Sequence, residues 1–415
     1  MKKIMKRIST ALTAALLLLS VLVSCTVSRH VTLPITSKTP LETAAPTHTA
    51  VSSSALPSTA VYGTASDPAL TGPDTKTLTE TSKAAIPVTD PVINTDTSEG
   101  PVIPDPDPAC FEIKLSFAGD VMLATNLNVL AKDNFRDYAE KKDPSYFLEK
   151  VGSYFDNDDF SLVNLECVLS DSEELTPIEK EGERVFWYVG SASNTRIITS
   201  YGIEAVSLSN NHAGDYGNKG RTDTIKAVED AGLIWGNDSN TIYYEKNGYR
   251  IAIITTGLWA SWWWKSRILP RLEDAKKNSD FQIIYWHGGT EKIHAPEEWK
   301  VEVSHLMVDA GADLVIGNHP HVLQPREIYN GVPIFYSIGN FCYGGAKRPE
   351  NRTVIYQYTL SIGKDSLELA GTEENIIPCY VYTGNINNFQ PAPIEDETEK
   401  QKVLDFLNGI TESPL

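Results

Sequence analysis

Two histidines flank a proline in the stretch GNHPH, residues 317–321, directly after an apolar run. Imidazole exchanges protons near neutral pH and is the commonest metal ligand in proteins. Alternate residues of an extended segment point the same way, and a proline between them limits the freedom of the backbone. The spacing therefore predicts that His319 and His321 face one side and bind one metal ion or two adjacent ions.

Four other apolar runs also end in polar residues that can bind a metal or carry a proton. They are FEIKLSFAGDVM at 111–122, FSLVNLE at 160–166, IEAVSLSNNH at 203–212 and FQIIYWHGG at 281–289. In an α/β sheet the carboxyl ends of the strands meet at one edge, where ligand-binding groups gather. We therefore expect one edge to collect Asp120, Glu166, Asn211, His212, His287, His319 and His321.

This mixture of carboxylate, amide and imidazole favours a divalent transition metal, with one or two ions of manganese, zinc or iron. Such an ion activates water and polarises a phosphoryl or carbonyl oxygen. His212 is placed to protonate a leaving group, and Asp215 is placed to orient the ring of His212. Each residue alone has a simpler alternative as a helix cap or an ordinary hydrogen-bonded side chain. The residues expected to hold metal are Asp120, Glu166, Asn211, His287, His319 and His321.

From about residue 110 onward, short β-rich runs alternate with helical patterns, which predicts an α/β layered domain. Apolar residues at helical spacing predict helices that cover the sheet over 296–311 and 218–235, and a final helix over 397–412. The segment 367–393 is expected to form strands that complete the second sheet. These elements would place the polar strand ends but carry no chemistry themselves.

The first quarter of the chain differs in composition from the rest. Residues 1–25 contain basic residues, a short apolar stretch and the sequence LVSC, which is typical of an export signal and resembles a bacterial lipobox. Cys25 would then carry a lipid, and the alternative is an ordinary cleaved signal peptide. Residues 26–109 are rich in Ser, Thr and Pro and are expected to form a disordered tether. The sequence thus predicts an extracytoplasmic lipoprotein of the cell membrane.

The formal net charge of −18 argues against a surface that gathers nucleic acid. An anionic substrate would need local positive charge, which a metal ion would supply. The four cysteines after Cys25 include no CxxC pair, so they do not indicate a structural zinc site, and buried thiols are the expected state.

Several of these motifs resemble the CapA-type capsule synthesis family, which is linked to poly-γ-glutamate and related to calcineurin-like metallophosphoesterases. The motifs are FAGDVML, VNLEC, LSNNHAGDYGNKG, WHGGTE and GADLVIGNHPHVLQPREIYNGVPIFYSIGNF. The resemblance implies a four-layer α/β/β/α sandwich over 110–385, with 386–415 as a C-terminal helical extension of the same domain. It also implies metal at the strand ends.

Residue by residue, the resemblance implies that the metallophosphoesterase ligands correspond to Asp120, Glu166, Asn211, His287, His319 and His321, with His212 as the acid. Two departures stand out. Met122 stands where phosphoesterases carry a histidine ligand, and Gly288 replaces the tryptophan usual in the family's HWGxE motif. Glu291, the glutamate of that motif, and Asn340 are expected to contact substrate.

The leading hypothesis is a lipid-anchored protein for synthesis, export or anchoring of an anionic polymer such as poly-γ-glutamate, with a metal-dependent hydrolase site. A phosphorylated or peptidic substrate is also compatible with it. The alternative is a non-catalytic scaffold or polymer-binding subunit of a membrane polymer synthase. The tryptophans of LWASWWWKSR at 258–267 could serve as a platform for a polymer, a sugar or the membrane interface, although a packed hydrophobic lid is favoured.

Overall fold

Strand β1 (Cys110–Met122) lies at the centre of the fold and runs into the first predicted ligand, Asp120. In this computed structural model it pairs in parallel with β3 (Phe160–Leu165) and antiparallel with β15 (Thr353–Gly363). The structure describes residues 109–415 except 130–131 and 183–184. The predicted signal peptide, the lipidation site Cys25 and almost all of the predicted tether lie outside the described residues.

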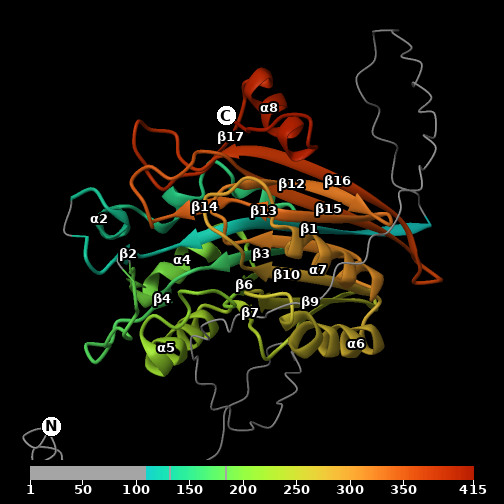
Figure 1. The fold of residues 1–415 in the computed structure, drawn as a ribbon, viewed down its shortest axis with the longest axis horizontal. Helices are drawn as coiled ribbons and strands as arrows, with labels where there is room; N and C mark the ends of the chain where they lie inside the picture. The colour runs from blue at the N-terminus through green and yellow to red at the C-terminus, as the bar shows by residue number, and fades with distance from the viewer. Residues whose placement is uncertain (1–108, 130–131, 183–184) are drawn as a thin grey trace, which may run out of the picture. The chain divides into compact units, whose positions relative to one another are not determined.

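Two large sheets contain most of the strands (Figure 1). The first is eight-stranded and has the order β17-β16-β15-β1-β3-β6-β7, with β14 also paired to β1. Its remaining strands are β6 (Ala205–Ser207), β7 (Ile234–Gly236), β14 (Asn340–Tyr343), β16 (Leu369–Tyr380) and β17 (Ala392–Pro393). The second is six-stranded and has the order β12-β13-β11-β10-β9-β8. Its strands are β8 (Ile242–Lys246), β9 (Tyr249–Gly257), β10 (Phe281–His287), β11 (Leu314–Asn318), β12 (Leu323–Tyr329) and β13 (Val332–Ile338).

The two sheets pack face to face through a shared hydrophobic core. Phe117 of the first sheet lies between Tyr285 of the second sheet and Tyr356 of the first, with ring centroids 6.4 and 6.3 Å apart. Alternation places every second residue of these strands in this core and sends the others to the outer faces. The burial of large aromatic rings here is a main source of stability.

Helices cover the outer face of each sheet, which completes the predicted four-layer sandwich. On the six-stranded sheet, α6 (Leu269–Asn278) and α7 (Glu298–Asp309) bury residues such as Leu272 and Met307. On the eight-stranded sheet, a second cluster includes Phe135 and Val228 from the covering helices. Those helices are α2 (Phe135–Lys141), α3 (Gly152–Asp156), α4 (Thr195–Ile198) and α5 (Gly217–Asp230).

The predicted helices form, but each ends earlier than predicted, and Ile234 and Trp235 belong to β7 instead of the helix before it. In α7, Met307 is buried and Leu306 is exposed, a choice that helical spacing alone leaves open. In α5, the helix ends at Asp230, and Gly232 has a positive φ of 77° that turns the chain back. The last helix, α8 (Glu397–Leu407), buries Val403, Phe406 and Leu407 in the core between the sheets.

One predicted strand assignment is wrong. The segment 367–393 contributes β16 and β17 to the sheet that contains β1, not to the second sheet. Strand β16 pairs antiparallel with β15 along its length, so the short turn between them decides which sheet it joins. The predicted division at residue 385 stays a prediction.

A small third sheet lies near the end of β1, with the order β2-β5-β4. Its strands are β2 (Thr125–Asn126), β4 (Val168–Leu169) and β5 (Tyr188–Gly190). The four cysteines that the structure describes, Cys110, Cys167, Cys342 and Cys379, are free. Among the described residues, no helix has both the length and the apolar character needed to cross a membrane.

Candidate metal centre

The carboxyl ends of parallel strands from both sheets meet at one edge of the sandwich. Asp120 comes from β1 and Glu166 directly follows β3, both in the first sheet, whereas His287 ends β10 in the second sheet. His319 and His321 follow β11. Sequence reasoning from strand ends expected a single sheet edge, and the structure instead assembles the group across two facing edges, as the four-layer resemblance implies.

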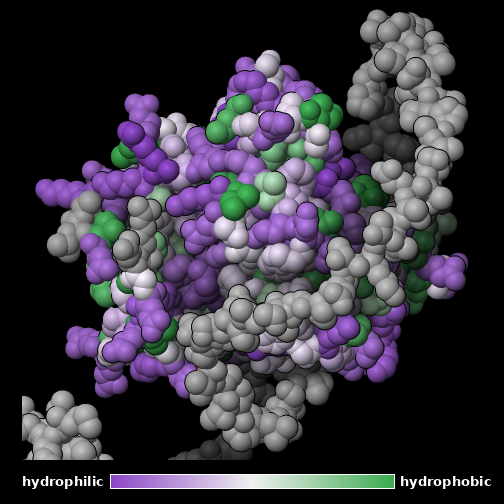
Figure 2. Space-filling view, viewed as in Figure 1, coloured by the Kyte–Doolittle hydropathy of each residue, from purple (hydrophilic) through white to green (hydrophobic). Residues whose placement is uncertain are grey.

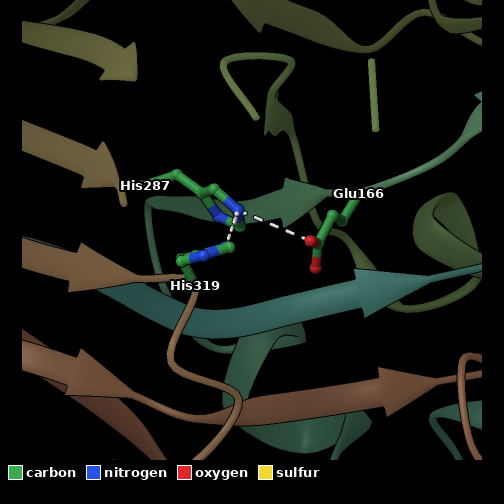
Figure 3. A group of neighbouring side chains, drawn as sticks. All are labelled: Glu166, His287 and His319. Carbon is green, nitrogen blue, oxygen red and sulfur yellow. Dashed lines mark hydrogen bonds and ion pairs between the residues drawn. The ribbon is translucent and has the colours of Figure 1, made fainter. Parts of the chain in front are cut away.

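The first group of potential ligands is Glu166, His287 and His319, whose side chains converge in Figure 3. The Nε2 atom of His287 lies 3.0 Å from Nδ1 of His319 and 3.4 Å from Oε1 of Glu166. Asn211 adds an amide oxygen 2.9 Å from the same His287 Nε2. The ligand atoms of Glu166, His287 and His319 lie within 4.8 Å of one another, and Asn211 contacts the His287 nitrogen that they share.

The second group is Asp120, Glu166 and His321. The Nδ1 atom of His321 lies 3.2 Å from Oδ2 of Asp120, and its Nε2 atom lies 3.7 Å from Oε1 of Glu166. Glu166 belongs to both groups, so its carboxylate lies between two potential ion positions.

A third group overlaps the second, formed by Glu291, His319 and His321. The carboxylate of Glu291, which the sequence analysis expects to contact substrate, lies within 4.8 Å of a nitrogen on each histidine. Unlike the other carboxylates of the centre, Glu291 is exposed at its surface.

The His-Pro-His turn is not extended, so the backbone reasoning that led to its prediction is wrong. His319 has φ = 98° and His321 has φ = 59°, both in the positive region that residues with a side chain rarely adopt. Such a conformation costs about 1–3 kcal/mol per residue and persists where its surroundings hold it in place. The main-chain N–H of His319 donates to Oδ2 of Asp120 at 3.2 Å, so the turn is fixed by the centre that it serves.

Asparagines hold the ligands in position. Asn164 contacts Oδ1 of Asp120 at 2.8 Å and Nδ1 of His287 at 3.0 Å. Asn340 was predicted to contact substrate, but its amide oxygen lies 2.9 Å from His321 Nδ1 and its amide N–H donates to the carbonyl oxygen of His321. Both residues are buried, so they orient ring nitrogens in the manner of an outer ligand shell.

The charges of the centre depend on one another. Burial lowers the pKa of His287 and of His321, but Glu166 and Asp120 outweigh it and raise these values to about 9 and about 10. Burial together with those two charged rings lowers the pKa of His319 to about 2. Burial raises the pKa of Asp120, yet His287 and His321 bring it well below its usual range. The carboxylates of Asp120 and Glu166 thus favour positive charge beside them, which the rings of His287 and His321 can carry as protonated imidazoles and which a divalent cation could carry instead.

The environment of Glu166 shows whether the residues of the centre fit a cation. Both of its oxygens are buried, and neither accepts a hydrogen bond from any residue that the structure describes. A buried carboxylate without such partners is costly unless a charge compensates it. Its neighbours in the two groups are three imidazoles and the carboxylate of Asp120, which are ligand types that zinc, manganese and iron take. The residues present fit a divalent transition metal.

His212 and Asp215 form a pair beside the centre. Nδ1 of His212 lies 2.8 Å from Oδ2 of Asp215, which is fully buried and also accepts the main-chain N–H of Tyr188 at 2.8 Å. The ring of Tyr188 packs edge-on against His212 at 4.7 Å. Because Asp215 engages Nδ1 of His212, Nε2 is the ring nitrogen that remains for proton transfer.

Three residues of this site, Asn164, Lys180 and Trp259, were not predicted as site residues. Lys180 lies in the loop between β4 and β5, and its Nζ is 2.5 Å from Oδ1 of Asp215. Trp259 was weighed only as part of a tryptophan cluster, yet its ring stands 5.8 Å from His287 and 5.1 Å from His319. Lys180 lies away from any apolar run, whereas Asn164 is the next-to-last residue of β3 and Trp259 follows the end of β9, so the strand-end pattern was available for those two.

The tryptophan cluster divides between the favoured lid and an exposed surface. Trp263 and Trp264 are buried against the outer face of the six-stranded sheet, whereas Trp262 is 63% exposed. The main chain at Gly288, just after β10, lies directly against the main chain at Leu258, where the tryptophan segment begins. A Cβ atom at Gly288 would overlap the carbonyl oxygen of Leu258. Glycine in place of the motif's tryptophan is therefore a steric requirement here.

Comparison with known proteins bears on the family. The chain is 25% identical over 316 residues to the PGA biosynthesis protein CapA of Bacillus subtilis, with 70% of this chain and 76% of that protein covered. It is 25% identical over 327 residues to the capsule biosynthesis protein CapA of Bacillus anthracis, with 72% and 74% covered. A solved structure described as a novel phosphatase from Mycoplasma pneumoniae aligns with a TM-score of 0.39 at 12% identity, over 65% of this chain and 94% of that one.

The family itself is assigned by residues 114–344, which match the family described as bacterial capsule synthesis protein PGA_cap. The matched range spans more than half of the chain and contains every residue of the candidate centre. It therefore confirms the predicted CapA-type resemblance. The chain belongs to the PGA_cap family of bacterial capsule synthesis proteins.

Proposed function

We propose that this chain acts in capsule or poly-γ-glutamate synthesis, export or anchoring, through a metal-dependent hydrolase site. The names of its two Bacillus relatives support the pathway, and the convergence of ligands at the sandwich edge supports the chemistry. The observation that carries the proposal concerns the Glu166 carboxylate. It is buried between His287 and His321, and neither of its oxygens accepts a hydrogen bond from a described residue.

A divalent ion held by Asp120, Glu166, Asn211, His287, His319 and His321 would activate water and polarise a phosphoryl or carbonyl oxygen. Asn164 and Asn340 hold the ligand rings and carboxylates in place, which limits reorganisation during reaction. His212 donates a proton from Nε2 to the leaving group. Oδ2 of Asp215 accepts the hydrogen bond from Nδ1–H of His212 and fixes the orientation of the ring.

Charge supports an anionic substrate class. An anionic cell-surface polymer, or a phosphorylated or peptidic precursor of one, would be attracted to the bound cation although the chain carries a net charge of −18. Anchoring would use a lipid on Cys25 and place the domain outside the cytoplasm, in the cell envelope. A membrane polymer synthase is the partner that such an arrangement favours.

A second candidate function is a non-catalytic scaffold that binds polymer or a synthase. Two observations favour it: Met122 offers no imidazole and is packed in the hydrophobic core, and Trp262 is exposed as a potential contact for a partner. In that case the centre would bind metal for structure or for ligand capture alone.

The experiment uses the purified full chain, loaded with manganese, and a generic phosphodiester as substrate. His212→Ala should reduce kcat by about 10²–10⁴-fold with little effect on KM, because it removes the proton donor. The control is His305→Ala, since His305 pairs with Glu327 on the protein surface away from the centre.

The two candidates differ further in cells. If hydrolysis is the function, cells with His212→Ala should lose surface polymer while the purified variant still binds polymer. Normal surface polymer in those cells, together with no hydrolysis by the wild type, would rule out the catalytic proposal and favour the scaffold.

A further inference from the structure

Glu291 lies in the loop that joins β10 to α7, beside the His-Pro-His turn. Main-chain hydrogen bonds anchor this loop on both sides of Glu291: the N–H of Gly288 donates to Asn318 at 3.1 Å, and the N–H of Lys292 donates to Pro320 at 2.8 Å. The loop and the turn are therefore held as one unit, and the carboxylate is presented to His319 and His321.

A buried network fixes the far end of the same loop. Lys300 in α7 is fully buried, and its Nζ donates to Oε1 of Gln324 at 2.8 Å. The amide of Gln324 in turn donates to the carbonyl oxygen of Ile293 at 2.7 Å. Burial of a lysine is unusual and needs such partners. The network therefore fixes the main chain at Ile293, two residues after Glu291.

The two ion positions are unequally supplied with ligands. The first has Glu166, His287, His319 and the amide oxygen of Asn211, whereas the second has only Asp120, Glu166 and His321. Met122 cannot complete the second set because its side chain packs in the core on the helix-covered face of the sheet. The carboxylate of Glu291 lies within 4.8 Å of a nitrogen of His321 and of a nitrogen of His319, at the open side of the second set.

We propose that Glu291 is a ligand of the ion in the second position, where it takes the coordination site that Met122 leaves open. The inference rests on the proposed metal centre and adds to it the number of ions and the chemistry of each position. His321 would bind this ion, and His319 would remain with the ion in the first position.

The donor sets then predict different metal preferences. Three carboxylates and one imidazole make the second position rich in oxygen, which suits manganese. Two imidazoles, a shared carboxylate and an amide make the first position better suited to zinc or iron. Manganese can enter both positions when it is the only metal supplied, so it is the probe that reports on both.

The test titrates the metal-free full chain with Mn²⁺ and follows bound metal by equilibrium dialysis and electron paramagnetic resonance. Wild type should bind about two ions, with the exchange-coupled spectrum of a close pair. Glu291→Ala should bind about one ion and give the spectrum of an isolated ion, and Glu291→Gln should weaken the second ion by roughly tenfold or more. Glu302→Gln, an exposed change on α7, is the matched control.

The outcomes separate the two proposals. A pair that persists in Glu291→Ala with unchanged affinity would overturn the role of Glu291 while leaving the metal centre intact. A single ion in wild type that Glu291→Ala also retains would overturn the second position. No binding by wild type would overturn the metal centre and the role of Glu291 together. Loss of one ion in the alanine variant, with normal circular dichroism, supports the inference even if no hydrolysis is found.

Discussion

At the scale of single residues, the centre depends on backbone positions as much as on ligands. His319 and His321 hold positive φ angles that bring both rings to the sandwich edge, a geometry that extended alternation would not give. These backbone conformations are stabilised because Asp120 accepts a hydrogen bond from the N–H of His319 and the amide N–H of Asn340 donates to the carbonyl oxygen of His321. Ligands and backbone thus stabilise each other, and strain of this kind is typical of functional sites.

Gly119 shows the same dependence and gives a residue-scale prediction. A Cβ atom at Gly119 would overlap the carbonyl oxygen of Gly339, to which the N–H of Asp120 donates at 3.0 Å. Gly119→Ala should therefore lower the free energy of unfolding by roughly 3 kcal/mol, the upper part of the range for overpacking. Urea denaturation of the full chain measures it.

The control is Gly371→Ala, because a Cβ atom at Gly371 has no neighbour within 4 Å. Its stability should stay within about 0.5 kcal/mol of wild type. Equal unfolding midpoints for Gly119→Ala and wild type would contradict the steric account of the first motif.

At the scale of elements, the strand ends were predictable and the loops were not. Asp120, Glu166 and His287 each follow an apolar run, and the convergence of parallel strand ends made their meeting predictable. Lys180 lies in a loop without periodicity, 35 residues before its partner Asp215, so no local pattern connects the two.

The sheet to which β16 belongs shows the same limit. The first part of β16 is largely exposed, so its burial pattern does not point to either sheet. The antiparallel pairing of β16 with β15 determines the sheet that it joins. Sequence pattern predicts that a strand forms, but not its neighbour, because pairing depends on contacts between distant segments. Trp259, by contrast, follows the end of β9, which pairs in parallel with β10, so the strand-end rule could have placed it near His287.

At the scale of the whole molecule, polar chemistry is divided between opposite ends of the strands. The candidate centre lies at the carboxyl ends, whereas Asp158 and Glu204 lie just before β3 and β6 at the other ends. Figure 2 shows hydrophilic residues over most of the visible described face, with hydrophobic ones in small separate patches. Stability can therefore be altered at the Asp158 and Glu204 end without touching the centre.

From the raised pKa of Glu204 we predict that the free energy of unfolding depends on pH. Burial raises its pKa from 4.5 to about 7, despite the N–H that Ser161 donates to it at 2.7 Å. Between these values the folded chain holds a proton that the unfolded chain has lost, so the Glu204 contribution to stability falls as pH rises from about 4.5 to about 7. Glu204→Gln should be more stable than wild type at pH 8 and no more stable at pH 4.

Urea denaturation at several pH values measures this difference, with the exposed Glu373→Gln as control. A constant difference between wild type and Glu204→Gln from pH 4 to pH 8 would show that burial does not perturb Glu204 in this way.

The central claim is that the strand ends of both sheets form one metal centre, and elemental analysis of the full chain tests it most directly. Wild type and Asp120→Ala would be purified in parallel, supplied with manganese, zinc and iron, and passed through a desalting column. The account predicts about one or two transition-metal ions per chain in wild type, with at least one lost in Asp120→Ala while the fold is kept. Wild type without metal, or equal metal content in both proteins, would contradict it.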